Sequence, residues 1–133
     1  MTIAAAIADL QTKALSLSGV KAAPASPPEA MSQFPFAVCY ARSGTLRQTS
    51  AGWATYLHTL ICEIHVARQM LPRAVEQAMP YIELFAAKLI ADPTLGGTVS
   101  TVVAVRYLFG RLSWGSEEHL GVQLEVEVKL MQS

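Results

Sequence analysis

Residues 122–130 alternate apolar and polar side chains without a break. Because successive side chains of a strand point to opposite faces, this pattern predicts a strand with one buried and one solvated face. The apolar positions are Val122, Leu124, Val126, Val128 and Leu130. Such a strand is typical of an antiparallel sheet, so other parts of the molecule must cover its apolar side.

Two further long strands are expected, and both are unusually apolar. Residues 99–112 carry apolar side chains on both faces for most of their length, and a short polar turn joins them to the alternating strand. Residues 53–66 predict a strand about 46 Å long at ~3.3 Å per residue, so its ends should project past a small core. This is more strand than one small subunit can cover, and we expect other copies of the same protein to cover the rest.

Two amphipathic helices are predicted. The first follows Thr2, a suitable N-cap, carries apolar residues at steps of three and four, and is expected to stop near Gly19. The second spans residues 72–91, and Pro80 in its interior predicts a kink or a division into two helices. Its expected apolar stripe consists of Val75, Met79, Ile82, Phe85 (or Ala86) and Leu89.

The remaining segments are predicted to be a connector, a short strand and a loop. Residues 20–35 contain four prolines and should run extended, either as an ordinary connector or as an arm that touches a neighbouring subunit. Residues 34–40 predict a short strand. Residues 42–52 are rich in Ser, Thr, Gln and Gly, and we expect a polar loop there.

This order of elements predicts an α+β fold, with a mainly antiparallel sheet of about four strands and helices packed on one face. A chain of 133 residues is expected to form a single domain, residues 1–133. Hydrophobic residues make up 52% of the chain, charged residues make up 15%, and the formal charge is zero. This composition argues against a sequence-reading nucleic-acid binder and suits close packing of identical copies. The N-terminus is not typical of a signal peptide, and no apolar run is long enough for a membrane span.

Few residue patterns in the chain are typical of a catalytic or metal site. We therefore expect no enzyme activity, cofactor or metal. His58 and Cys62 share a strand face but stand about 13 Å apart at ~3.3 Å per residue, while Glu63 and His65 point the other way. A metal site from these four is therefore not expected, and the histidines are interpreted as satisfied residues of the sheet. Cys62 and the second cysteine, Cys39, are interpreted as buried thiols in a reducing cytoplasm.

Aromatic and charged residues gather near the two predicted hairpin ends, where they either keep the sheet soluble or anchor an interface. Aromatic residues and arginine are enriched in such anchors. The candidates for contact with other subunits or partners are Arg42, Arg47, Trp53, Arg111, Trp114, Glu117 and Glu118.

Several segments, in this order, make the chain resemble the tail terminator (tail completion) proteins of long-tailed, non-contractile phages. They are Pro27-Pro28-Glu29, residues 34–38, residues 57–66, residues 71–75, residues 91–99 and Leu108-Phe109-Gly110. Together these segments span most of the chain. None of them is a chemical motif, so the resemblance is one of pattern and order.

The resemblance implies a structural virion protein that assembles into a ring, typically a hexamer. The ring caps the tail tube, ends its polymerisation and joins the tail to the head–neck connector. DNA passes through the ring without sequence-specific binding, and no membrane is involved. The implied location is the head-proximal end of the virion tail, after assembly in the host cytoplasm.

Two alternatives stay open from the sequence. The first is a neck or head-completion ring subunit of the same kind of virion. The second is a small dimeric enzyme or ligand-binding α+β domain, which predicts a closed apolar pocket with convergent polar groups.

Overall fold

The computed structural model describes residues 2–24, 33–49, 52–68, 72–115 and 117–130, apart from the side chains of residues 49 and 52–56. The described residues form two helices and four strands. In chain order these are α1 (Ile3–Leu15), β1 (Phe36–Thr49), β2 (Gly52–Ala67), α2 (Pro72–Ala91), β3 (Thr101–Trp114) and β4 (Glu117–Lys129).

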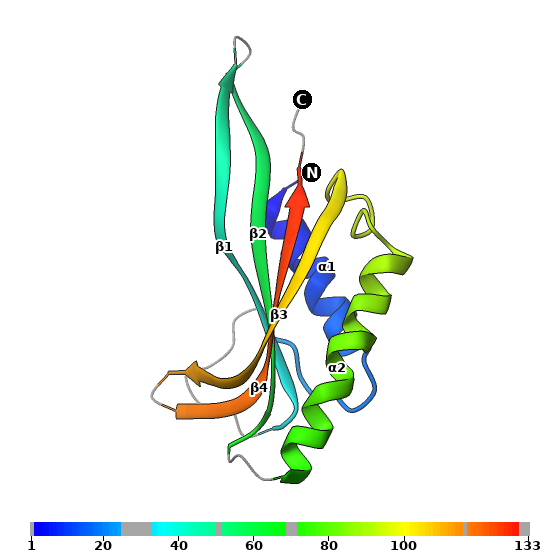
Figure 1. Cartoon of the computed structure of the whole chain (residues 1–133). Helices are drawn as coiled ribbons and strands as arrows, with labels where there is room; N and C mark the ends of the chain where they lie inside the picture. Colours follow the sequence, from blue (N-terminus) through cyan, green and yellow to red (C-terminus); the bar gives the residue numbers. More distant parts are fainter. Residues whose placement is uncertain (1, 25–32, 50–51, 69–71, 116, 131–133) are drawn as a thin grey trace.

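The four strands form one antiparallel sheet in the order β1-β2-β4-β3, and both helices pack on one of its faces (Figure 1). This confirms the predicted α+β class. The β1–β2 hairpin and the β3–β4 hairpin close at opposite ends of the sheet. In Figure 1 the β1–β2 hairpin extends well beyond the helices, as expected from the length predicted for the strand over residues 53–66.

The main core lies between the sheet and the helices. The alternating strand behaves as predicted, since all five of its apolar positions between Val122 and Leu130 are buried. They meet the helix-facing side of β2, which includes Leu60 and Ile64, and the large side chain of Phe85. Burying a side chain of this size contributes about 2–3 kcal/mol, so this layer is the main source of stability.

The helices differ from the prediction in detail. The buried face of α2 is rotated from the predicted stripe and consists of Ala74, Ala78, Tyr81, Phe85 and Leu89. Met79, predicted to be buried, is exposed. The two alanines on this face allow the helix backbone to approach the sheet closely. Of the two alternatives predicted at Pro80, the division into two helices is wrong, because α2 is one continuous helix through this residue.

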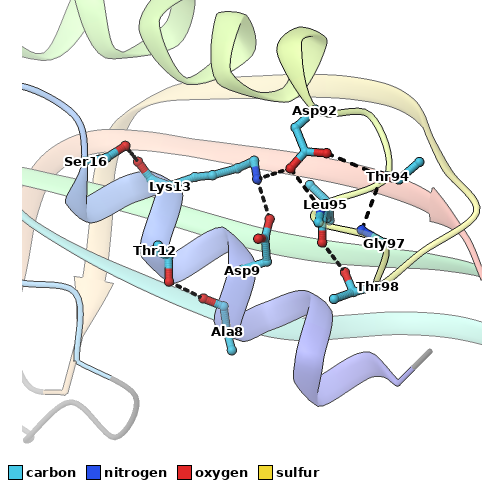
Figure 2. A network of polar contacts seen from close by, with 11 residues as sticks. Ala8, Asp9, Thr12, Lys13, Ser16, Asp92, Thr94, Leu95, Gly97 and Thr98 are labelled. Carbon is cyan, nitrogen blue, oxygen red and sulfur yellow. Dashed lines mark hydrogen bonds and ion pairs between the residues drawn. The ribbon is translucent and has the colours of Figure 1, made fainter.

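The start of α1 is capped as predicted, because Thr2 Oγ1 accepts a hydrogen bond from the Ala5 amide at 3.1 Å. Lys13 then ties the end of this helix to the segment after α2 (Figure 2). Its Nζ atom lies 2.5 Å from Asp9 Oδ2 and 2.8 Å from Asp92 Oδ2. Burial lowers the pKa of Lys13, but the two carboxylates outweigh it and the net shift is upward. Asp92 also accepts a hydrogen bond from the Gly96 amide, so one carboxylate holds both the helix pair and the following turn.

The predicted loop over residues 42–52 is wrong, and so is the short strand that was expected to precede it. Strand β1 continues to Thr49 and pairs with β2 as far as Gly52. Two register shifts, one between Ala41 and Ser43 and one between Gly44 and Leu46, absorb the irregular part of the sequence. Polar side chains are compatible with this strand because β1 lies at the edge of the sheet, where one side of the strand is in contact with solvent.

The other edge strand, β3, leaves much of its apolar surface uncovered. Tyr107 and Leu108 are 61% and 63% exposed, and Val103 is also exposed. Tyr107 and Leu108 belong to opposite faces, since they pair with Leu124 and Gln123 of β4. The helices therefore cover β3 only in part, which agrees with the expectation that one subunit carries more apolar strand than it can shield.

Candidate functional site

The paired ends of β3 and β4 turn away from the line of the sheet, toward the face opposite the helices (Figure 1). Gly110 and Gly121 stand directly opposite each other in this part of the ladder. At Gly121 an added Cβ would lie 2.2 Å from the carbonyl oxygen of Ile64 and 3.1 Å from the Cα of His65. Only glycine allows β4 to approach β2 this closely at the bend.

The bent hairpin encloses a second, smaller core, which we call the outer cluster. It contains Phe34, Phe36, His65, Trp114 and His119. The rings of Phe36 and His65 are stacked, with centroids 4.6 Å apart. Phe34 meets His119 edge-on at 5.0 Å. Both histidines are buried, with exposed fractions of 0% and 2%.

A chain of hydrogen bonds runs through the outer cluster from β2 to β4. His65 Nε2 lies 2.9 Å from Glu63 Oε1, and His65 Nδ1 lies 2.9 Å from His119 Nδ1. His119 Nε2 lies 3.0 Å from Glu117 Oε2, to which the Arg68 guanidinium comes within 3.5 Å. Two carboxylates thus flank a pair of imidazoles that lie away from solvent.

The distances restrict how the four ring nitrogens of the histidine pair can donate and accept hydrogen bonds. Each Nε2 faces a carboxylate oxygen and must therefore carry a hydrogen to donate. The two Nδ1 atoms are within hydrogen-bond distance, which is favourable only when a single hydrogen lies between them. A hydrogen bond between the two Nδ1 atoms links β2 to β4 within this network.

Glu63 has three hydrogen-bond partners among the described residues. Besides His65, it accepts hydrogen bonds from Tyr40 Oη at 2.6 Å and from Gln123 Nε2 at 2.9 Å. Burial raises the pKa of Glu63, but these three hydrogen bonds favour the ionised form and the net shift is downward. For Tyr40, burial and then the hydrogen bond to the Glu63 carboxylate raise the pKa well above its usual value. Glu117 also has a lowered pKa, chiefly because of its hydrogen bond from His119.

The lowered pKa of Glu63 predicts a loss of stability in acid. A carboxyl whose pKa is lower in the folded state stabilises the fold above its unfolded pKa, and this contribution is lost as the pH falls through the folded value. We therefore expect the free energy of unfolding to fall below about pH 4.5, and Glu63→Gln to flatten this part of the pH profile. Urea denaturation at several pH values between pH 3 and pH 7 measures this free energy of unfolding.

The matched control for this experiment is Glu83→Gln, which neutralises an exposed carboxylate on α2. It should leave the acid slope close to that of the unsubstituted protein. Equal slopes for the unsubstituted protein and Glu63→Gln would contradict the assignment of the acid loss to Glu63.

The arrangement is suited to holding the hairpin end in position. Its histidines are buried, and the groups within hydrogen-bond distance of their ring nitrogens belong to the same network. The network joins the inner strand β2, through His65, to the end of the bent hairpin, through His119. It therefore holds the hairpin end in one place on the sheet.

The sequence interpretation missed His119 altogether. The signal that points to it is a repeated triplet, Glu63-Ile64-His65 and Glu117-Glu118-His119. In a strand, residues two apart share a face, so each triplet places a carboxylate beside its own histidine. Nothing local indicates that the two triplets meet, because 54 residues separate the histidines.

The predicted interface residues do not form one site, because three come from the β1–β2 hairpin and four from the end of the β3–β4 hairpin, and Arg42 lies midway along its strand. Arg42 and Arg47 lie in strand β1 rather than in a loop, and Arg42 pairs across the sheet with Glu125. The side chain of Trp53 lies outside the part of the chain that the structure describes. The four remaining candidates, Arg111, Trp114, Glu117 and Glu118, are at the end of the β3–β4 hairpin.

The hairpin-end group is partly structural. Trp114 packs on Phe36 at a centroid distance of 6.4 Å, and Glu117 accepts from His119, so both belong to the outer cluster and its network. Arg111 and Glu118 form an ion pair at 3.5 Å, and both side chains are mostly exposed. Of the four candidates at the hairpin end, Arg111 and Glu118 are the two whose side chains are mostly exposed.

The four residues weighed as metal ligands divide between the two faces of the sheet, as expected. Among the described residues, no group of three or more His, Cys, Asp or Glu side chains is arranged to hold a metal ion.

His58 is buried on the helix side, and its Nε2 atom has no hydrogen-bond partner in the described part of the chain. Burial alone lowers its pKa, so the neutral imidazole is favoured there. Gly44 makes room for this ring, since a Cβ at that position would lie 2.0 Å from His58 Nδ1.

Neither α1 nor α2, the helices of the described residues, is long and apolar enough to cross a membrane. The chain matches no protein-family model, and no curated protein matches it at a significant level.

Proposed function

We propose that this protein is a ring-forming structural subunit of a phage tail, which caps the tail tube, ends its polymerisation and joins the tail to the head or neck. The observation that carries the proposal is a sheet whose edge strands, β1 and β3, each have one neighbouring strand and exposed apolar side chains in the described part of the chain. The resemblance to tail terminator proteins supplies the biological setting.

Each edge strand offers a different surface to another copy. Strands β1 and β3 are both 14 residues long and each has one neighbour in the sheet. Residues 21 and 22 cover only the beginning of the β1 edge, through hydrogen bonds with Pro35 and Ala37. Leu46 on β1 and Leu108 on β3 are 57% and 63% exposed. Long exposed edges of this kind favour pairing with another strand.

The occupant we assign to each edge is the other edge of a second copy. If β1 of one subunit pairs with β3 of the next, every copy uses two different patches. Such a head-to-tail contact generates a ring when the rotation between subunits closes. A continuous sheet around the ring also removes every free edge, which is the physical gain from assembly.

The first test is the mass of the assembly in solution. We expect light scattering after size-exclusion chromatography to give a closed oligomer, alone or after addition of tail-tube protein. A protein that stays monomeric under both conditions would overturn the proposal. The protein that co-purifies with the ring distinguishes the two ring functions. A terminator co-purifies with tube protein, and a neck subunit co-purifies with the portal-side adaptor.

Lysine substitutions at the two edges test the head-to-tail contact directly. We expect Leu46→Lys and Leu108→Lys each to abolish the ring while leaving a folded monomer, because a charge on the edge opposes strand pairing. An equimolar mixture of the two variants retains one good edge on each molecule. It should therefore form a dimer and nothing larger.

The matched control is Met79→Lys, which makes the same change at an exposed apolar residue of α2. It should assemble normally. Rings that persist in Leu46→Lys or Leu108→Lys, or a mixture that fails to dimerise, would exclude the β1–β3 contact. Circular dichroism of each variant verifies that the monomers are folded.

A further inference from the structure

The two cysteines of the chain lie directly opposite each other in neighbouring strands. Cys39 of β1 pairs with Cys62 of β2, and their Sγ atoms are 3.2 Å apart. Both are free thiols on the helix side of the sheet.

The hydrogen-bond pattern of β1 shows which kind of cross-strand pair they form. The amide of Ala37 donates to the carbonyl of Ala22, on the side of β1 away from β2. Cys39 is two residues further along the same strand and therefore directs its backbone groups to the same side. The cysteines thus occupy a non-hydrogen-bonded pair, in which Cα atoms are about 4.5 Å apart. This separation is within the range that disulfides span, so a bond requires little movement of the backbone.

The two thiols differ in access to solvent. Cys62 is fully buried, and its hydrogen bond with Cys39, followed by burial, raises the pKa of its thiol well above the usual value. Cys39 is half-buried and lies on an edge strand. A small reagent therefore meets Cys39 first, while Cys62 stays a protonated thiol beside it.

We propose that Cys39 and Cys62 form a redox-active dithiol that a low-molecular-weight disulfide of the glutathione type oxidises to an intramolecular disulfide. The Cys39 thiolate attacks one sulfur of the reagent, forms a mixed disulfide and releases one thiol. Cys62 then loses its proton and attacks Cys39 Sγ, which releases the second thiol. The protein loses two electrons and two protons, and the reagent is reduced to two thiols. The new bond ties the edge strand β1 to β2.

The test is to incubate the folded protein with oxidised glutathione and to follow its mass and its free thiols. We expect the intact mass to fall by two hydrogen atoms, no free thiol to remain after denaturation, and dithiothreitol to restore both. The melting temperature should rise by about 5 °C on oxidation, because the crosslink constrains the unfolded chain.

Two single variants establish the order of attack. Cys62→Ser should stop at a stable glutathione adduct on Cys39, and Cys39→Ser should react only in denaturant. A folded protein that keeps both thiols, an adduct that Cys62 never displaces, or crosslinking between molecules would each overturn the proposal. This chemistry does not depend on ring formation, so its failure and that of the proposed function are read separately.

Discussion

Replacing Gly121 with alanine is expected to destabilise the fold by at least about 3 kcal/mol. The new Cβ would lie 2.2 Å from the Ile64 carbonyl oxygen, and both that atom and the nearby His65 Cα belong to the backbone of β2. A backbone cannot rotate out of the way as a side chain does, so β4 must separate from β2 where the hairpin bends. Urea denaturation measures the loss as a lower midpoint.

Gly110→Ala is the matched control, because Gly110 is the direct partner of Gly121 in the ladder. A Cβ at Gly110 meets no atom within 4 Å, and its φ of +149° leaves only backbone strain as a cost. We expect a loss of about 1–2 kcal/mol. A Gly121→Ala variant as stable as Gly110→Ala would show that close approach of the strands is not what requires glycine at the bend.

The second large effect is expected at the histidine pair. His65→Leu should cost about 3 kcal/mol, since it removes the partner of His119 Nδ1 and one donor to Glu63 from a buried network. His119→Leu should cost a similar amount for the same reason. The hairpin end, released from β2, should also exchange its amide hydrogens faster than the rest of the sheet.

The double variant separates the interaction between His65 and His119 from their interactions with other residues. If His65 and His119 share one proton, His65→Leu/His119→Leu should cost clearly less than the sum of the two single variants, by at least about 1 kcal/mol. Strictly additive losses would show that the histidines act independently and would contradict the shared proton. Denaturation at neutral pH, where Glu63 and Glu117 are ionised, provides the comparison.

Local sequence patterns predicted most of the fold because those patterns follow the geometry of single elements. The strict alternation over residues 122–130 identified a strand and its buried face, and Thr2 identified the start of α1. The α+β class followed from the order of such elements. In each case the pattern lies within one element, where the period of the backbone decides which side chains share a face.

The errors arose where a distant partner decides the structure. Residues 42–49 look like a loop, but the first half of β2 is available to pair with them, and bulges at Arg42 and Thr45 absorb the mismatch. The buried face of α2 is rotated from the prediction, because the surface that a helix meets, and not its apolar residues alone, fixes its orientation.

What the sequence by itself determined is the set of elements and the surplus of apolar strand that leaves β3 exposed. Only the tertiary structure decided which strands are edges, which faces stay open, and that the end of one hairpin folds onto the other side of the sheet. The site follows the same division: each Glu-x-His triplet is local, whereas the contact between His65 and His119 spans 54 residues. Backbone periodicity acts over a few residues, but contacts between elements depend on the packing of the whole chain.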